Sequence, residues 1–341
     1  MIASDALIRS LPKAELHVHV EGAVAPATIA DLARRNGVDL GVADPAELYR
    51  YRDLADFLRV FDVVCRSLRT ADDLHRVTFE ALGIAAAAGV RYREMFFSPT
   101  FLMRHGVAFA TIWDGIVAGV REAAEEHDIV CRMILDVHKP AGAAAAEELI
   151  DLAAGCDRDV LIGIGGDAGE RDIDLVAFAE PFARARRLGL RTTMHLGEEG
   201  PSSDIATGVR TLGIERIDHG VSLVDDPELT AEVADRRIPL TCCPTSNVSI
   251  GILPSVAAHP LLRLDAAGVL VSVSSDNAEM FGVDVADELS KVRDAFDADL
   301  DTVGRLCRSS FESAWLDDVE RHRYLTELDV ALSAAARIDE R

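Results

Sequence analysis

Two histidines separated by a single residue, His17 and His19, are the first side chains of this sequence that could do chemistry together. They fall in an apolar run over residues 13–20 that is typical of a β-strand. Alternate side chains of a strand point to the same face, so both imidazoles could reach one metal ion. Two half-buried histidines that serve packing alone would show the same spacing, so this pair by itself leaves both interpretations open.

Four more polar residues stand at or near the ends of later apolar runs, namely His195, Glu198, His219 and Asp276. An unpaired carboxylate at the end of a buried strand is costly, and a bound cation would explain Asp276. An aspartate in this place can also simply cap the helix that follows. Together, three histidines and one carboxylate at four strand ends fit a mononuclear zinc site with one position open for water.

Eight short runs, rich in β-branched and apolar residues, are expected to form the strands that position these side chains. Stretches of helical character, such as 108–127 and 226–236, separate them, which favours a parallel sheet covered on both faces. Eight such units predict an α/β fold, a (β/α)8 TIM barrel with its active site at the carboxyl ends of the strands. The expected strands cover residues 13–20, 92–99, 130–137, 161–167, 191–198, 216–222, 238–247 and 270–277.

The segment 22–90, between the first two expected strands, is too long for a single crossover. We therefore expect extra helices inserted after strand 1, laid over or beside the barrel mouth as part of a lid. No linker, repeat or low-complexity tract divides the sequence, so residues 1–341 are expected to form one barrel domain.

The composition narrows the class of protein. With 35 Lys+Arg against 58 Asp+Glu, the net charge of −23 would repel a phosphate backbone, so nucleic acid is not an expected partner. A hydrophobic content of 49% excludes intrinsic disorder. We expect neither a signal peptide nor a membrane span, and the six cysteines, without framework spacing, indicate reduced thiols in a cytoplasmic protein. The sequence leaves a homo-oligomer open.

Five local motifs carry a family resemblance. LPKAELHVHVEGAV, MHLGEE, RIDHG, CPTSNVSIG and SSDNAEMFG, spread over residues 11 to about 282, resemble the adenosine/adenine deaminase family of the amidohydrolase superfamily. The fourth strand ends GIGGD, without the lysine that bridges two metals in dinuclear amidohydrolases, which favours one Zn²⁺ per chain. The resemblance implies that Glu198 is the proton shuttle and that His219 orients the attacking water. It implies four zinc ligands, His17, His19, His195 and Asp276.

Three further positions bear on the substrate. Adenosine deaminases have an aspartate near the ribose 5′-hydroxyl, whereas this sequence has Glu21, as in the bacterial adenine and aminodeoxyfutalosine deaminases that it resembles most. The resemblance places the backbone of Ala168 opposite the purine N3. The aspartate that bonds the purine N7 is replaced by Asn277, whose amide donates at any pH. Asn277 could instead only cap the following helix.

The resemblance implies a hydrolase that converts a 6-aminopurine nucleoside or base to the 6-oxopurine and ammonia. The expected substrates, in order, are adenosines with modified 5′ groups, adenosine or deoxyadenosine, and adenine. Because of Asn277, deamination of another aminated heterocycle, such as a modified purine or a pterin, is a second interpretation. An inactive purine-binding or regulatory barrel is a third, which the intact ligand set and Glu198 argue against.

Overall fold

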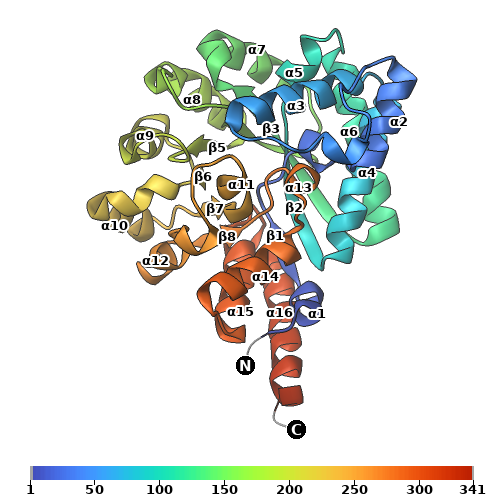
Figure 1. The fold of residues 1–341 in the computed structure, drawn as a ribbon. Coiled ribbons are helices and arrows are strands. Elements are labelled where there is room, and N and C mark those ends of the chain that lie inside the picture. The colour runs from blue at the N-terminus through green and yellow to red at the C-terminus, as the bar shows by residue number, and fades with distance from the viewer. Residues whose placement is uncertain (1–2, 340–341) are drawn as a thin grey trace.

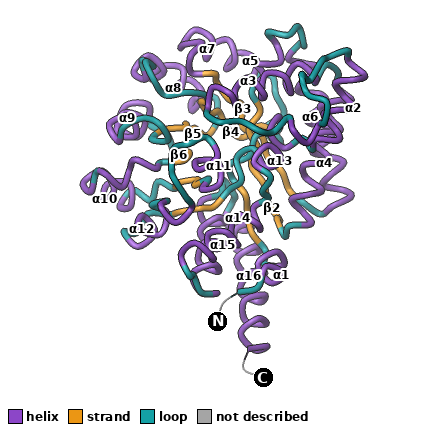
Figure 2. Tube along the Cα trace, in the orientation of Figure 1, coloured by secondary structure: helices purple, strands orange, loops and turns teal. Residues whose placement is uncertain are grey.

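Eight parallel strands lie at the centre of the molecule, each hydrogen-bonded to the next in chain order, with helices around them (Figures 1 and 2). The computed structural model describes residues 3–339. It confirms the predicted (β/α)8 barrel. The strands are β1 (Lys13–Glu15), β2 (Val90–Phe97), β3 (Val130–His138), β4 (Leu161–Asp167), β5 (Arg191–Leu196), β6 (Arg216–His219), β7 (Leu240–Cys242) and β8 (Val271–Val273).

The barrel closes just beyond β1 and β8. The backbone N–H of His19 donates to the carbonyl of Asp276 at 2.8 Å, and the N–H of Asp276 donates to the carbonyl of His17 at 3.0 Å. The predicted first strand, 13–20, is therefore too long: after Glu15 only isolated bridges at Val18 and His19 continue the pairing. The seventh and eighth strands are also shorter than predicted.

The predicted helices between the strands are present, and 108–127 and 226–236 correspond to α6 and α10. The helices are α1 (Asp5–Ser10), α2 (Pro26–Asn36), α3 (Leu54–Ser67), α4 (Ala71–Ala87), α5 (Pro99–Met103), α6 (Phe109–His127), α7 (Gly142–Ala153), α8 (Ala179–Arg187), α9 (Ser202–Thr207), α10 (Pro227–Asp235), α11 (Pro244–Ser249), α12 (Leu261–Ala266), α13 (Ala278–Phe281), α14 (Val285–Phe296), α15 (Leu300–Ser313) and α16 (Asp318–Asp339).

The insertion after β1 contributes α2, α3 and α4, as expected (Figure 1). Helix α3 begins at a side-chain cap, because the carboxylate of Asp53 accepts the backbone N–H of Asp56. Its apolar face is buried, and the ring of Phe57 stacks on Phe281 of α13 with 5.3 Å between centroids. Phe61 meets Phe101 of α5 at 5.1 Å. These contacts fix α3 against two segments that follow strand ends.

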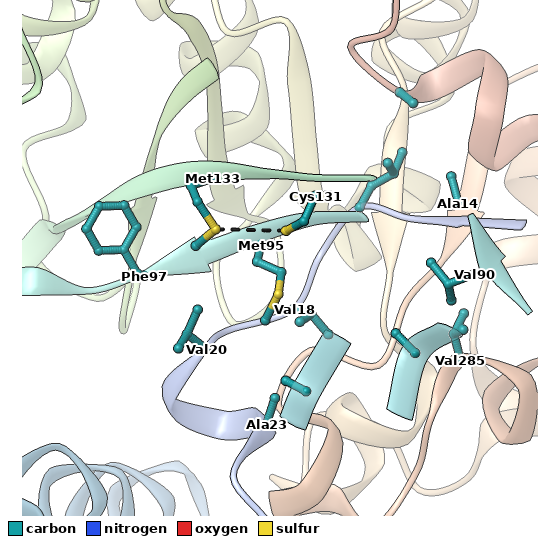
Figure 3. Close-up of a cluster of buried hydrophobic side chains, with 14 of the residues drawn as sticks. Ala14, Val18, Val20, Ala23, Val90, Met95, Phe97, Cys131, Met133 and Val285 are labelled. Carbon is teal, nitrogen blue, oxygen red and sulfur yellow. Dashed lines mark hydrogen bonds between the residues drawn. The ribbon is translucent and has the colours of Figure 1, made fainter. Parts of the chain in front are cut away.

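Apolar side chains on the outer faces of the strands pack under the helices. The register pairs Met95 of β2 with Met133 of β3, and Cys131 lies two residues before Met133, so its side chain leaves the same face (Figure 3). The alternate residues of these strands, such as Phe96 and Asp136, then point toward the barrel interior. All six cysteines are buried free thiols. No helix within residues 3–339 has both the length and the apolar character of a membrane span.

Candidate metal centre and active site

The structure brings the four predicted metal ligands together at the carboxyl end of the barrel. The Nε2 atoms of His19 and His195 lie 3.2 Å apart. Oδ1 of Asp276 lies 3.4 Å from Nε2 of His19 and 3.6 Å from Nε2 of His17. All four side chains are buried. These ligands meet because the barrel closes by hydrogen bonds between residues 17–19 and Asp276, which are far apart in the sequence.

The donor atoms fit a zinc ion. Nε2 of His17 is buried and has no hydrogen-bond partner among the described residues, although it faces a carboxylate and two other imidazoles. Burial and the neighbouring His17 and His219 hold the pKa of His195 well below its ordinary value, so this ring stays neutral, as a metal ligand must. Three imidazole nitrogens and one carboxylate oxygen are a donor set that zinc prefers.

Asp218, to which the sequence analysis gave no role, supports two of these histidines from behind. The strand register places Asp218 beside His195 on one side and Thr241 on the other. Its carboxylate accepts hydrogen bonds from Thr241 at 2.9 Å and from Thr193 at 2.7 Å. Nδ1 of His17 and of His195 each lie 3.8 Å from this carboxylate, beyond hydrogen-bond distance, and Oγ1 of Thr241, 3.0 Å from Nδ1 of His17, links that ring to it. A carboxylate on this side favours the tautomer that leaves Nε2 free for a metal.

Glu198 and His219 face each other across the site, with 3.4 Å between Oε1 and Nδ1. Asn247 of α11 donates from Nδ2 to Oε1 of Glu198 at 2.7 Å. Burial, with the negative charges of Asp276 and Glu170 nearby, raises the pKa of Glu198 well above its ordinary value. Asn247 lies in the CPTSN motif, but it is 49 residues from Glu198 in the sequence, so no local pattern predicts their contact.

The loop that carries Glu198 is held by a second carboxylate that the sequence analysis did not single out. Glu170 accepts the backbone N–H of Gly197 on Oε2 at 2.7 Å. Its Oε1 accepts the N–H groups of Glu198 and Glu199 at 2.8 and 3.2 Å. Three donors on one buried carboxylate leave this loop little freedom.

A cavity with about 550 Å³ of empty space, part of it open to solvent, lies over the candidate metal centre. Polar groups from the strand ends form one part of its wall, and apolar side chains of α3, α5 and α13, with Ile250 just after α11, form the other. Ala168, His219 and Asp276 each have a left-handed backbone, with φ of 68°, 66° and 62°, a conformation that is costly for these residues and concentrates at functional sites. The lining residues are His19, Leu54, Phe57, Leu58, Phe61, Phe101, Asp167, Ala168, His195, Glu198, His219, Ser246, Ile250, Asp276, Asn277 and Phe281.

Two of the three predicted substrate residues, Ala168 and Asn277, line this cavity. Asn277 donates to Oδ1 of Asp276 at 2.6 Å and makes no side-chain cap for α13, so nothing here supports the capping interpretation. Glu21 does not line the cavity. It is buried, and its Oε1 accepts the backbone N–H of Ser98 at 2.9 Å.

Comparison with known proteins agrees with this geometry. The family model described as adenosine deaminase matches residues 12–331. An adenine deaminase of Streptomyces coelicolor is 38% identical over 97% of this chain and 98% of its own length. One of Cupriavidus metallidurans is also 38% identical, over 96% of this chain and 93% of its own length.

Solved structures agree as well. The adenine deaminase from Arthrobacter aurescens superposes with a TM-score of 0.91 at 31% identity, over 95% of this chain and 99% of its own. An amidohydrolase from Burkholderia ambifaria, solved with bound Zn, has a TM-score of 0.90 at 31% identity, over 98% of this chain and 94% of its own. The chain belongs to the adenosine deaminase family of metal-dependent hydrolytic deaminases.

Proposed function

We propose that this protein deaminates the free base adenine to hypoxanthine and ammonia, with one zinc ion per chain. The observation that carries the proposal is the convergence of three imidazoles and a carboxylate beside the half-buried acid Glu198. The sequence alone favoured adenosines with modified 5′ groups. We place the free base first because the relatives at 38% identity are named adenine deaminases and because Glu21 does not line the cavity.

His17, His19, His195 and Asp276 would hold the zinc ion. The relative from Burkholderia ambifaria, with bound Zn, supports this choice of metal. When bound, zinc supplies Lewis-acid activation of a water molecule at the ring carbon that carries the amino group.

Glu198 supplies the proton that makes this carbon electrophilic. Burial raises its pKa well above the ordinary value, which favours the protonated acid. Asn247 donates to Oε1, so the carboxyl proton belongs on Oε2, from which it can pass to N1 of the purine. Once N1 is protonated, C6 accepts the attacking oxygen, and ammonia leaves when the amino nitrogen has gained a further proton.

His219 holds the attacking water and stabilises the charge that develops on its oxygen. Its position is fixed by the left-handed turn at the end of β6 and by Asn247, which lies 3.3 Å from Nδ1. Burial and the neighbouring His17 keep the pKa of His219 well below its ordinary value. With Nδ1 accepting from Asn247, the neutral ring carries its proton on Nε2 and can donate it to the attacking oxygen.

Asn277 and Ala168 would read the edges of the base. One N–H of the Asn277 amide is engaged by Asp276, and the second is available for N7. The backbone N–H of Ala168 would donate to N3.

The test is the loss of aminopurine absorbance on zinc-loaded protein with adenine, adenosine, deoxyadenosine and a 5′-modified adenosine side by side. Turnover of adenine above the nucleosides supports the proposal. Exclusive turnover of a pterin or another amine would replace it with the second interpretation from the sequence. If no substrate of the panel is turned over although one zinc is bound per chain, the result would indicate the inactive purine-binding barrel.

Asn277→Asp tests base recognition. If Asn277 reads the base, we expect the ratio of kcat/KM for adenine and adenosine to change, with unchanged zinc content. An unchanged ratio would remove Asn277 from the recognition site.

A further inference from the structure

We propose that Asp167 selects the free base over nucleosides by accepting the hydrogen of the purine N9–H. This proposal rests on the proposed function and names the group that sets its substrate class. Asp167 is the last residue of β4, is 6% exposed and lines the cavity next to Ala168.

The Asp167 carboxylate is oriented by a short chain of hydrogen bonds. Ser98 donates from Oγ to Oδ2 of Asp167 at 2.6 Å. The backbone N–H of Ser98 donates in turn to Oε1 of Glu21 at 2.9 Å. One oxygen of Asp167 is thus held by the protein, and the other is left for a different partner.

That second oxygen, Oδ1, is buried and has no hydrogen-bond partner among the described residues. The nearest imidazole nitrogen, Nδ1 of His138, is 3.7 Å away, beyond hydrogen-bond distance. Asp136, in the same cluster, offers two oxygens that themselves lack partners. Because a buried acceptor without a donor is unfavourable, the molecule that fills the cavity is the natural source of a donor.

Free adenine presents a donor and an acceptor side by side on the edge remote from its amino group. N3 accepts and the adjacent N9–H donates. Consecutive residues at the end of β4 offer the complementary pair: the N–H of Ala168 for N3 and Oδ1 of Asp167 for N9–H. A nucleoside carries carbon in place of this hydrogen, so the N9 donor is lost and Oδ1 would face the sugar.

The test compares adenine with 9-methyladenine, which keeps the reacting amino group and every ring atom but lacks the N9 hydrogen. For the wild-type protein we expect kcat/KM to favour adenine by about 100-fold, since sites built to hydrogen-bond a group strongly reject analogues without it. Asp167→Asn keeps the size of the side chain but can turn a donor toward N9. We expect the variant to lower the ratio of kcat/KM for adenine over 9-methyladenine at least tenfold, because kcat/KM for adenine falls.

Asp172→Asn is the matched control, because Asp172 is an exposed residue of the next loop, and it should leave the ratio unchanged. Zinc content is measured for each variant, because Asp167 lies close to the ligand His19. If Asp167→Asn does not fold, Ser98→Ala provides the second variant. It frees Oδ2 and should lower the ratio several-fold.

Equal kcat/KM for the two bases in the wild-type protein would overturn the proposal. So would an Asp167→Asn variant with the wild-type ratio, which would indicate exclusion of the methyl group by size alone. Either result leaves adenine deamination intact. Failure of both bases to react would instead contradict the proposed function.

Discussion

Replacement of Glu170 by glutamine should reduce turnover although Glu170 is not in the lining of the cavity. Its carboxylate accepts backbone N–H groups from Gly197, Glu198 and Glu199 at 2.7 to 3.2 Å. These bonds hold the segment that presents the proposed proton donor, Glu198. Glutamine has nearly the same shape, but one of its two terminal atoms is a donor and cannot accept any of them.

The magnitude follows from the number of lost acceptors. A hydrogen bond to a charged group contributes about 1.5–3 kcal/mol. If the amide nitrogen faces Gly197, one such bond is lost, and if it faces Glu198 and Glu199, two are lost. The amide can turn so that only the bond to Gly197 is lost, so the free energy of unfolding should fall by about 1.5–3 kcal/mol. A loosened segment also misplaces Glu198 in the transition state, where about 1.4 kcal/mol of lost stabilisation lowers the rate tenfold, and we expect kcat on adenine to fall at least this much.

The assay measures kcat, zinc content and urea unfolding of Glu170→Gln beside Glu199→Gln. Glu199 is the matched control, because it lies in the same segment and its carboxylate is 3.8 Å from Arg171. We expect the control to stay within twofold of the wild-type kcat, and both variants to bind one zinc. A Glu170→Gln enzyme with wild-type kcat would refute the argument that this carboxylate positions Glu198.

Three further predictions concern other groups. Glu198→Gln should keep zinc but lower kcat by about 10²–10⁴-fold, because its amide cannot deliver the proton; wild-type turnover would exclude Glu198 as the shuttle. Asp218→Ala should weaken zinc binding about 10–100-fold, as read from competition with a chelator, whereas a wild-type affinity would deny Asp218 its supporting role. Burial raises the pKa of Glu288 from 4.5 to about 7, so its folded form binds the proton more tightly than the unfolded chain. The free energy of unfolding of the wild type should then fall by about 2 kcal/mol between pH 5 and pH 8, and that of Glu288→Gln should not. The same pH dependence of urea unfolding in both proteins would contradict this.

Local sequence pattern determined the architecture. Buried strands are continuous apolar runs and surface helices have a 3.6-residue period, so both are visible without knowledge of the contacts. Strand-end polar residues stand out against such runs, and the structure gathers His17, His19 and Asp276 at one point. The strand lengths were less visible, because the pairing of His17 and His19 with Asp276 depends on a closure between the two ends of the chain.

Only the tertiary structure decided which groups support the site. Asp218 lies beside His17 and His195 because of the register of three neighbouring strands. Glu170 meets a loop 27 residues away, and Glu21 turns to Ser98 instead of the cavity. The sequence fixes the type and local spacing of each side chain. The direction in which a buried side chain points, and the partner it meets, follow from long-range packing, which no local pattern encodes.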